Sequence, residues 1–226
     1  MKKYWWLFLI GGLTACYIIF SFLGILRFYY VPTGSNEPNI RPRAWILATR
    51  LSGPKPLDFI CYHHGPFEGA PASIWVKRLC GIPGDTVKMV DGILWVNGHN
   101  ADSSLNLKMG FVLPAGELKK LGEGYFADEL DQPQRVGNNA DSVYANIGTT
   151  DFRKDGLKGR FAIDTTTIEE MKSLFGKAGT RDNFGPFVVP PGKFFVLGDN
   201  RHSSADSRYT GFIDRQDYRG TVCGIY

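Results

Sequence analysis

The sequence lacks several patterns that would place it in a common functional class. No run of basic residues occurs in its 226 residues, and the formal net charge is only +4. Nucleic acid is therefore not expected as a partner, because binding it needs a clustered positive surface. The four cysteines form no Cys-x-x-Cys pair and no zinc-type grouping with histidine, so we expect no metal and no cofactor. The four histidines suggest no Ser-His-Asp arrangement.

Charge is also absent between Lys3 and Arg27. The segment Tyr4–Leu26 is apolar and long enough to span a bilayer, which needs about 20 such residues. Lys2 and Lys3, on its short N-terminal side, favour a cytoplasmic N-terminus with the remaining chain outside the cytoplasm. A cleaved signal peptide and a lipoprotein box at "LTAC" are alternatives, but the apolar segment continues past both cleavage points. We therefore predict a membrane anchor at residues 1–27.

Short runs rich in β-branched and aromatic residues fill residues 28–98 and 187–226. Examples are "AWILATR", "LDFICYHH", "SIWVKRL" and "KFFVLG", and their composition predicts a mainly β core in two parts. In "TVKMVDGILWVNG" the pair Asp91-Gly92 separates two alternating runs, which predicts a two-residue hairpin. The residues expected on one face of this hairpin are Val87, Met89, Ile93 and Trp95.

The segment between these two parts, residues 99–186, has a different character. It is richer in Gly, Asp, Asn and Lys, and its hydrophobic periodicity is weaker, so we predict an inserted subdomain. One helix is expected at "TTIEEMKSLFG", with Thr167 and Glu170 forming a capping box and Gly176 ending the helix. The predicted fold is therefore mainly β, with antiparallel sheets, a large α/β insertion and one N-terminal transmembrane helix.

Three short stretches carry the residues that could perform chemistry. "PTGSNEP" places Ser35 on a loop just after the anchor, "WVKRLCGIPGD" places Lys77 in an apolar run, and "GDNRHSSADSR" crowds polar groups into residues 198–208. Taken alone, Ser35 is a turn residue and Lys77 is a lysine exposed at a strand edge. Taken together they suggest a dyad, because a buried lysine loses its proton readily and can then accept one from a serine hydroxyl.

These stretches, in this order behind an apolar anchor, resemble bacterial type I signal peptidases, which are membrane-anchored serine proteases with a Ser/Lys dyad. The resemblance covers the anchor, residues 31–98 and residues 188–225. It implies that Ser35 is the nucleophile and Lys77 the general base, with Thr33 and the Ser35 backbone N–H forming the oxyanion hole. The stretch "GDNRHSSADSR" is similar to the family's most specific signature. The residues that it implies as support for the dyad are Asp199, Asn200, Ser204, Asp206 and Arg208, with Ser204 orienting the lysine amine.

The resemblance also implies a substrate and a place. The substrate would be the signal peptide of an exported preprotein, with small residues at positions −1 and −3, bound extended beside a sheet edge. The enzyme would sit in the bacterial cytoplasmic membrane, so lipid is a second expected partner. The residues expected at the substrate pocket are Val31, Asn36, Trp75 and Val76. Asn36 replaces the family's usual Met, and His202 replaces a common acidic residue and is interpreted as a surface variation.

Two alternatives and one structural question stay open at this point. The chain could be a dedicated peptidase for one substrate class, such as pilin precursors, because Asn36 departs from the general pattern. It could also be a catalytically inactive, membrane-anchored binding protein, although the presence of both Ser35 and Lys77 argues against this. Self-cleaving repressors share the Ser/Lys chemistry but carry a DNA-binding module that is absent here. A Cys61–Cys80 disulfide would suit an extracytoplasmic domain.

Overall fold

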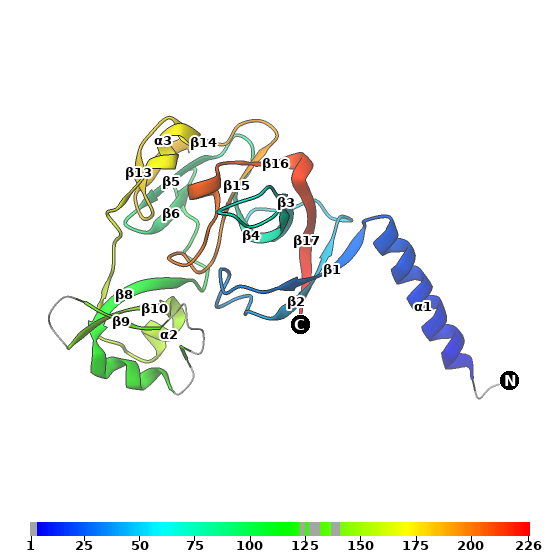
Figure 1. Ribbon diagram of the computed structural model, residues 1–226, viewed down its shortest axis with the longest axis horizontal. Helices are drawn as coiled ribbons and strands as arrows, with labels where there is room; N and C mark the ends of the chain where they lie inside the picture. The colour runs from blue at the N-terminus through cyan, green and yellow to red at the C-terminus, as the bar shows by residue number, and fades with distance from the viewer. Residues whose placement is uncertain (1–3, 123–124, 127–131, 137–140) are drawn as a thin grey trace.

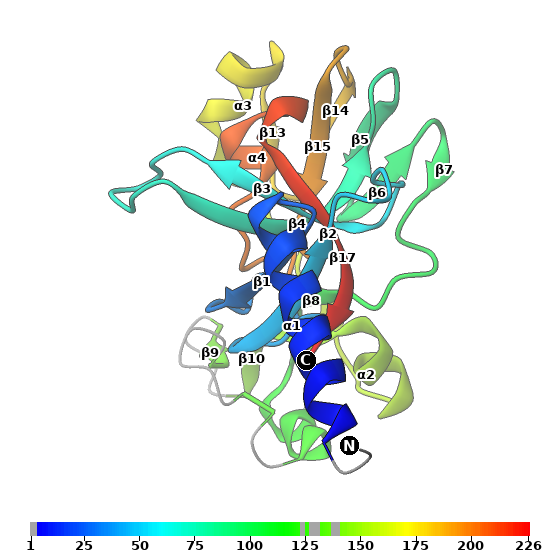
Figure 2. The same ribbon diagram turned by 90° about the vertical axis from the view of Figure 1, so that its right-hand side faces the viewer.

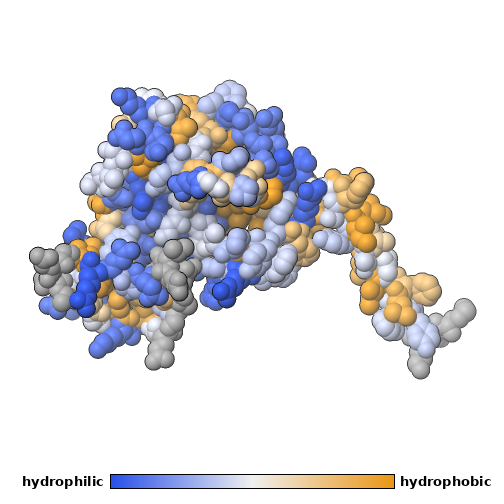
Figure 3. All heavy atoms as spheres, viewed as in Figure 1, coloured by the Kyte–Doolittle hydropathy of each residue, from blue (hydrophilic) through white to orange (hydrophobic). Residues whose placement is uncertain are grey.

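An N-terminal helix stands apart from the body of the molecule (Figure 1). The computed structural model describes residues 4–122, 125–126, 132–136 and 141–226. The helix α1 (Trp5–Phe22) has a mean hydropathy of 1.8 and buries none of its residues, so it presents apolar side chains outward (Figure 3). It is long and apolar enough to cross a membrane, as predicted. It is shorter than the apolar segment because the chain turns after it and residues from Leu26 onward form a strand.

A seven-stranded antiparallel sheet forms the centre of the molecule. Its strand order is β1-β2-β17-β3-β4-β15-β16, so the last strand of the chain lies between two early ones, as Figures 1 and 2 show. The strands are β1 (Leu26–Val31), β2 (Ala44–Thr49), β17 (Tyr218–Ile225), β3 (Phe59–His64), β4 (Ser73–Gly81), β15 (Lys193–Leu197) and β16 (Ile213–Asp214). This order joins the two predicted parts of the core in one sheet, because β17 and β15 come from the second part.

A second antiparallel sheet has the order β14-β5-β6-β7. Its strands are β5 (Thr86–Val90), β6 (Ile93–Val96), β7 (His99–Asn100) and β14 (Phe184–Val188). Asp91 and Gly92 connect β5 to β6 with φ values of 48° and 77°. Two successive positive φ values belong to the tight turn whose twist matches the flanking strands, so the predicted hairpin is confirmed.

The face predicted for this hairpin is wrong in its second strand. The register places Met89 opposite Leu94, and both side chains are buried, whereas Ile93 is 40% exposed. Residues directly opposite one another in an antiparallel pair point to the same face. A two-residue loop pairs position 90 with 93, so the residues of β6 that share the face of Val87 and Met89 are Leu94 and the partly buried Val96, not Ile93 and Trp95.

The inserted region has a sheet of its own, with the order β11-β8-β10-β9 (Figure 1). Its elements are β8 (Lys108–Pro114), η1 (Ala115–Leu121), β9 (Gln134–Arg135), β10 (Ser142–Gly148), α2 (Thr149–Lys154) and β11 (Arg160–Phe161). The apolar side chains of β8 and β10 bury against one another and against Leu157 to form a core separate from that of the main sheet. The presence of both helices and strands here agrees with the predicted α/β insertion. The boundaries of the insertion at residues 99 and 186 stay a prediction.

The predicted helix of the insertion forms, but it begins later than expected. Thr167 and Ile168 form the short strand β12 (Thr167–Ile168), which pairs with β13 (Gly179–Thr180). The helix α3 (Glu169–Phe175) therefore starts with Ile168 at its N-cap and has no side-chain cap. The capping box was wrong because strand pairing takes the backbone of Thr167. Gly176 ends the helix with a φ of 75°, as predicted.

The cysteines of the core are free thiols. Cys61 on β3 and Cys80 on β4 are both buried, and neither is in a disulfide. In the pairing of β3 with β4, Cys61 lies opposite Val76, four positions from Cys80 along β4. Burial raises the pKa of both thiols to about 12, so both stay protonated and inert. The disulfide considered from the sequence is therefore not formed.

The hairpin turn provides a test of how the insertion packs on the core. A Cβ added at Gly92 would lie 2.5 Å from the ring of Phe161, and the φ of Gly92 is positive. We expect Gly92→Ala to lower the free energy of unfolding by about 2–4 kcal/mol, the sum of left-handed strain and overpacking. Urea denaturation of the full chain in detergent measures this. Gly84→Ala, at a φ of 92° with no atom near its Cβ, is the control and should cost about 1–2 kcal/mol. Equal losses would contradict the packing of β11 on this turn.

Candidate active site

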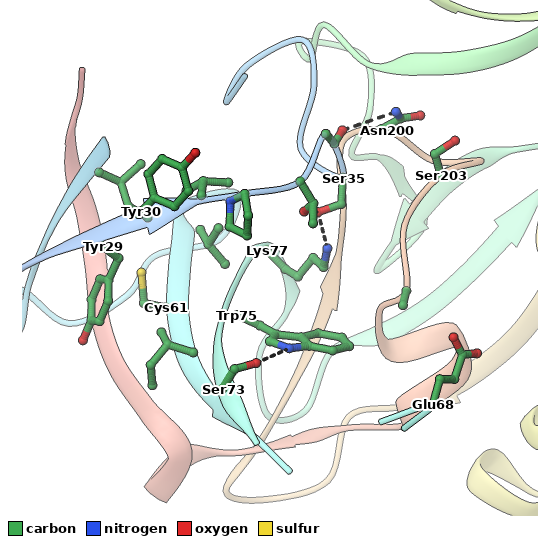
Figure 4. Close-up of a pocket in the computed structure, with 18 residues that line it drawn as sticks. Tyr29, Tyr30, Ser35, Cys61, Glu68, Ser73, Trp75, Lys77, Asn200 and Ser203 are labelled. Atoms are coloured by element: carbon green, nitrogen blue, oxygen red, sulfur yellow. Dashed lines mark hydrogen bonds between the residues drawn. The ribbon is translucent and has the colours of Figure 1, made fainter. Parts of the chain in front are cut away.

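The strand order brings the three chemically interesting stretches to one place. Lys77 lies on β4, and β15, the next strand in the sheet, leads directly into residues 198–208. Ser35 follows β1 in the loop to β2. The backbone N–H of Asn200 donates to the carbonyl of Ser35 at 3.1 Å, and its side-chain amide donates to the carbonyl of Gly34 at 3.3 Å (Figure 4). Segments more than 100 residues apart therefore meet at Ser35.

The amine of Lys77 contacts the hydroxyl of Ser35. The distance from Nζ to Oγ is 2.6 Å (Figure 4), and Lys77 is only 5% exposed. The amine lies over the ring of Trp75, 5.7 Å from its centroid, so the two residues share a face as the alternation predicts. Burial lowers the pKa of Lys77 from 10.5 to about 8, although Asp206 raises it and Arg208 lowers it further. About a tenth of the amine is then neutral at pH 7, far more than for a lysine with a pKa of 10.5.

A second hydroxyl stands beside that of Ser35. The Oγ1 of Thr33 is 3.3 Å from the Oγ of Ser35, and both residues line the same cavity. A carbonyl attacked by Ser35 would have this hydroxyl and the Ser35 backbone N–H close to its oxygen. Donors aimed at such an oxygen each contribute about 3 kcal/mol in serine hydrolases. The position of Thr33 therefore suits the role predicted for it.

Residues 198–208 contain a fully buried ion pair. Asp206 and Arg208 are both 0% exposed and bond at 2.8 Å through two nitrogens of the guanidinium. Burial by itself raises the pKa of Asp206, but Arg208 outweighs it and the pKa is lowered overall. The carboxylate also accepts from the backbone N–H of Gly198 at 3.0 Å. Asp206 therefore connects the two ends of residues 198–208. Removing either partner of the ion pair would leave a buried charge without its counter-charge, which is strongly destabilising.

Asp199 makes a second buried network on the other side of β4. It accepts two bonds from Arg78, at 2.6 and 2.5 Å, and one from the amide of Asn39 at 2.6 Å. Asn39 belongs to the loop that carries Ser35, so Asp199 links that loop to β4. Sequence reasoning identified Asp199 but missed Arg78 and Asn39, because no local pattern connects residues that lie 121 and 160 positions away.

A cavity of about 750 Å³ opens beside the dyad. Three of the four residues expected at the substrate pocket line it: Val31, Trp75 and Val76. Side chains of β1, β2 and β4 complete the wall, including Ile46 and Ile74. Tyr29 and Tyr30 of β1 also line it (Figure 4). The wall is largely apolar, as a pocket for small aliphatic side chains requires.

Asn36 is the exception and corrects the expectation from the sequence. It is 0% exposed and does not line the cavity. Its side-chain amide instead donates to the carbonyl of Val76 at 2.8 Å. The amide nitrogen thus bonds to the backbone of β4, next to Lys77, whereas the buried Oδ1 has no hydrogen-bond partner among the described residues. Its influence on the pocket is therefore through the placement of β4 and not through contact with a ligand.

Ser204 is also placed differently from the role predicted for it. Within the described part of the chain, its hydroxyl bonds only to the carbonyl of Ala205, at 3.4 Å, and not to Lys77. The residue packs on Gly198, where an added Cβ would lie 2.2 Å from the Ser204 Oγ and 2.4 Å from the Ser35 carbonyl oxygen. Gly198 is thus required for the close approach of this segment to the nucleophile, and Ser35 is the hydrogen-bond partner of the amine.

His202 was interpreted from the sequence as a surface variation, and the structure corrects this. Its side chain is 1% exposed and contacts Asp182 and Tyr144, both from the inserted region. Sequence reasoning missed these partners because they lie 20 and 58 positions away.

Among the described residues, no group of three His, Cys, Asp or Glu side chains could hold a metal ion.

A mainly β protein with a buried lysine amine on a serine hydroxyl has the arrangement of the Ser/Lys class of hydrolases. Comparison with known proteins identifies the family of the chain. The family model described as "Signal peptidase, peptidase S26" matches residues 2–226. The chain therefore belongs to the signal peptidase family, peptidase S26.

Individual relatives carry the same description. A signal peptidase I of Bacillus licheniformis is 30% identical over 148 residues, which cover 65% of this chain and 47% of that protein. This chain thus matches about half the length of that relative. A signal peptidase I of Aquifex aeolicus is 27% identical over 209 residues, covering 89% and 76%. A crystal structure of a signal peptidase I from Enterococcus faecalis is 22% identical and covers 75% of this chain and 97% of that chain, with a TM-score of 0.35.

The burial of Lys77 predicts a cost to stability. Burial holds the folded-state pKa near 8, below the 10.5 of the unfolded chain, so the unfolded state binds more protons between these values. The free energy of unfolding should therefore rise with pH from about 8 to 10.5 and be lowest below that window. We expect Lys77→Met to raise it by about 1–3 kcal/mol at pH 7, with a smaller gain at pH 10.

Urea denaturation of the full chain at pH 7 and pH 10 measures this difference. Lys88→Met is the matched control, because Lys88 also lies over a tryptophan ring, 5.8 Å from the centroid of Trp95, but is not buried. A destabilised Lys77→Met protein at pH 7, with Lys88→Met unchanged, would contradict the burial cost.

Proposed function

We propose that this chain is a membrane-bound serine endopeptidase that removes N-terminal signal peptides from exported preproteins. The observation that carries the proposal is the 2.6 Å contact between the buried amine of Lys77 and the hydroxyl of Ser35. Membership of the signal peptidase family supports the substrate class, because the relatives above bear that description. The cavity beside the dyad provides a place for the residues that precede the cut.

In the first step, Ser35 attacks the scissile carbonyl while Lys77 accepts its proton. The new C–O bond makes a tetrahedral intermediate, whose oxyanion lies near the Thr33 hydroxyl and the Ser35 N–H. The C–N bond then breaks, and the Lys77 ammonium gives its proton to the leaving amine. The mature protein departs with a new N-terminus, and the signal peptide stays attached to Ser35 as an ester.

In the second step, a water molecule takes the place of the leaving amine. Lys77, again neutral, accepts a proton from this water as the water attacks the ester carbonyl. The intermediate collapses, the bond to Ser35 breaks, and the ammonium returns a proton to the serine oxygen. The signal peptide leaves as a carboxylic acid, which loses its remaining proton to water and becomes a carboxylate. A single amine therefore serves as base and acid in both steps, which its pKa of about 8 allows near neutral pH.

The substrate is proposed to bind as an extended strand. β1 stands at one end of the main sheet and pairs only with β2 among the described strands, so its other edge is open to an added peptide. The cavity is lined by residues of β1 on one side and of β4 on the other. An extended peptide sends alternate side chains to the same side, which fits small residues at −1 and −3 entering the wall near Val31 and Val76.

The chemistry is proposed to take place at a membrane surface, and the apolar helix α1 supports this. α1 ends at Phe22, and Ser35 follows after a single strand, β1. Lys2 and Lys3 precede the helix, and positive charge favours the cytoplasmic side, so the catalytic domain is proposed to lie outside the cytoplasm. Membrane lipid is then the immediate surrounding of the nucleophile, where a membrane-embedded signal peptide ends.

Cleavage of a preprotein tests the proposal. We expect the full chain in lipid vesicles to cut a preprotein with an Ala-x-Ala site once, after the second Ala. Ser35→Ala and Lys77→Met should each lower the rate about 10³-fold or more, because each removes a partner of the dyad. Mass spectrometry identifies the cut, and gel densitometry gives the rate.

Lys88→Met again serves as the matched control and should keep the wild-type rate. A folded Lys77→Met protein that still cuts would rule out the dyad. If the wild type leaves the general preprotein intact but cuts pilin precursors, the enzyme is a dedicated peptidase. If it cuts neither, an inactive binding protein of the same fold is the better description.

A further inference from the structure

His202 occupies a closed site between the catalytic segment and the inserted region. Its ring Nε2 lies 3.0 Å from both carboxylate oxygens of Asp182, and its Nδ1 lies 2.9 Å from the hydroxyl of Tyr144. The side chains of His202 and Asp182 are each 1% exposed. A carboxylate only accepts, so Nε2–H donates to Asp182. Both nitrogens of the ring are thus bonded to residues of the insertion.

The residues around the imidazole lie close to it, and Gly110 shows how close. A Cβ added at Gly110, on β8, would lie 2.3 Å from the Nδ1 of His202 and 2.5 Å from the hydroxyl of Tyr144. The ring of Phe161 lies 5.7 Å from the imidazole, centroid to centroid. Arg181 donates to the backbone carbonyl of His202 at 3.1 Å. The site is therefore shaped around the imidazole by at least three strands or turns of the insertion.

The hydrogen bonds continue from His202 to the wall of the catalytic cavity. The Tyr144 hydroxyl lies 2.9 Å from the side-chain oxygen of Asn146 as well as from His202, and its single proton serves one of the two at a time. The Asn146 amide donates to the hydroxyl of Ser203 at 3.0 Å. Ser203 lines the catalytic cavity (Figure 4). The chain of bonds thus leaves the catalytic segment at His202, passes through β10, and returns one residue later at Ser203.

The backbone around His202 also connects to the nucleophile. The N–H of Ser203 donates to the carbonyl of Asn200 at 3.1 Å, which closes a tight turn with His202 inside it. Asn200 holds the carbonyls of Ser35 and Gly34 through its backbone and side-chain N–H groups. A shift of the His202 ring would therefore move the turn, and with it the donor groups that hold the loop of Ser35.

We propose that His202 is a positioning residue for the reaction and that the inserted subdomain sets the geometry of the nucleophile through it. The proposal rests on the proposed function, because it assigns His202 to the reaction at Ser35. His202 does not touch the dyad, so it acts on the rate through position alone. A displacement of about 1 Å in a reacting group can cost about 100-fold in rate, so a partial loss of the clamp should cost about tenfold.

Two variants separate the clamp from simple packing. Tyr144→Phe keeps the ring that stacks parallel to the imidazole at 9° and removes only the hydroxyl. His202→Gln keeps a donor able to reach Asp182 and loses the bond to Tyr144. We expect both, in the full chain in vesicles, to lower kcat for a preprotein about tenfold with KM within twofold. His99→Gln, at an exposed position on β7, is the matched control and should leave both constants unchanged.

Amide hydrogen exchange provides a readout that does not depend on activity. The Asn200 and Ser203 amides should exchange at least tenfold faster in Tyr144→Phe and His202→Gln than in the wild type, and at the wild-type rate in His99→Gln. Unchanged kcat together with unchanged exchange would overturn the proposal. Urea denaturation measures the folded fraction of each variant. A kcat that falls only in proportion to that fraction would also overturn the proposal. If the wild type cuts no preprotein, the proposed function fails, and the exchange rates alone decide whether His202 holds the turn.

Discussion

The burial of one amine is the constraint on which the rest of the site depends. In its proposed role as general base, Lys77 has to lose its proton near neutral pH, and an exposed lysine does so far less readily. Its position on β4, between β3 and β15, removes it from water, and the pKa falls to about 8 for that reason. A strand in the middle of a sheet can hold such a side chain because the stability of the folded core offsets the free-energy cost of burying the amine.

The charged residues around the amine are arranged so that they do not undo this shift. The carboxylate of Asp206 favours the charged form of the amine and raises the pKa of Lys77, but by less than burial lowers it. Arg208 pairs with Asp206 at 2.8 Å and lowers the pKa of Lys77, so the two effects oppose one another. Asp199 is paired with Arg78 in the same way. These ion pairs fix the geometry of residues 198–208 while leaving burial as the dominant influence on the amine.

The sequence predicted the parts of the structure whose signals are local. The anchor follows from an uncharged apolar run, and the hairpin follows from Asp91-Gly92 between alternating residues. The meeting of Ser35 with Lys77 followed from a resemblance spread over three motifs. No local pattern states which strands are neighbours, so a resemblance was needed to bring these motifs together.

The errors arose where a distant partner decides the outcome. Thr167 would cap a helix in isolation, but its backbone pairs with β13 instead. Asn36 was assigned to the cavity wall, and it turned out to bond to Val76, 40 positions away. His202 was assigned to the surface, and residues of the insertion bury it. In each case the decisive contact is tertiary, and composition around the residue does not contain it.

The most direct test of this account is the pKa of the Lys77 amine itself. Full-length protein with ¹⁵N-labelled lysine, held in micelles, would be titrated by NMR from pH 6 to pH 11, and the Lys77→Met protein would identify the resonance. The account predicts a midpoint near 8 for Lys77, well below the 10.5 from which burial lowers it. A midpoint near 10.5 for Lys77 would contradict it, because the amine would then be charged at neutral pH and unable to accept the proton of Ser35.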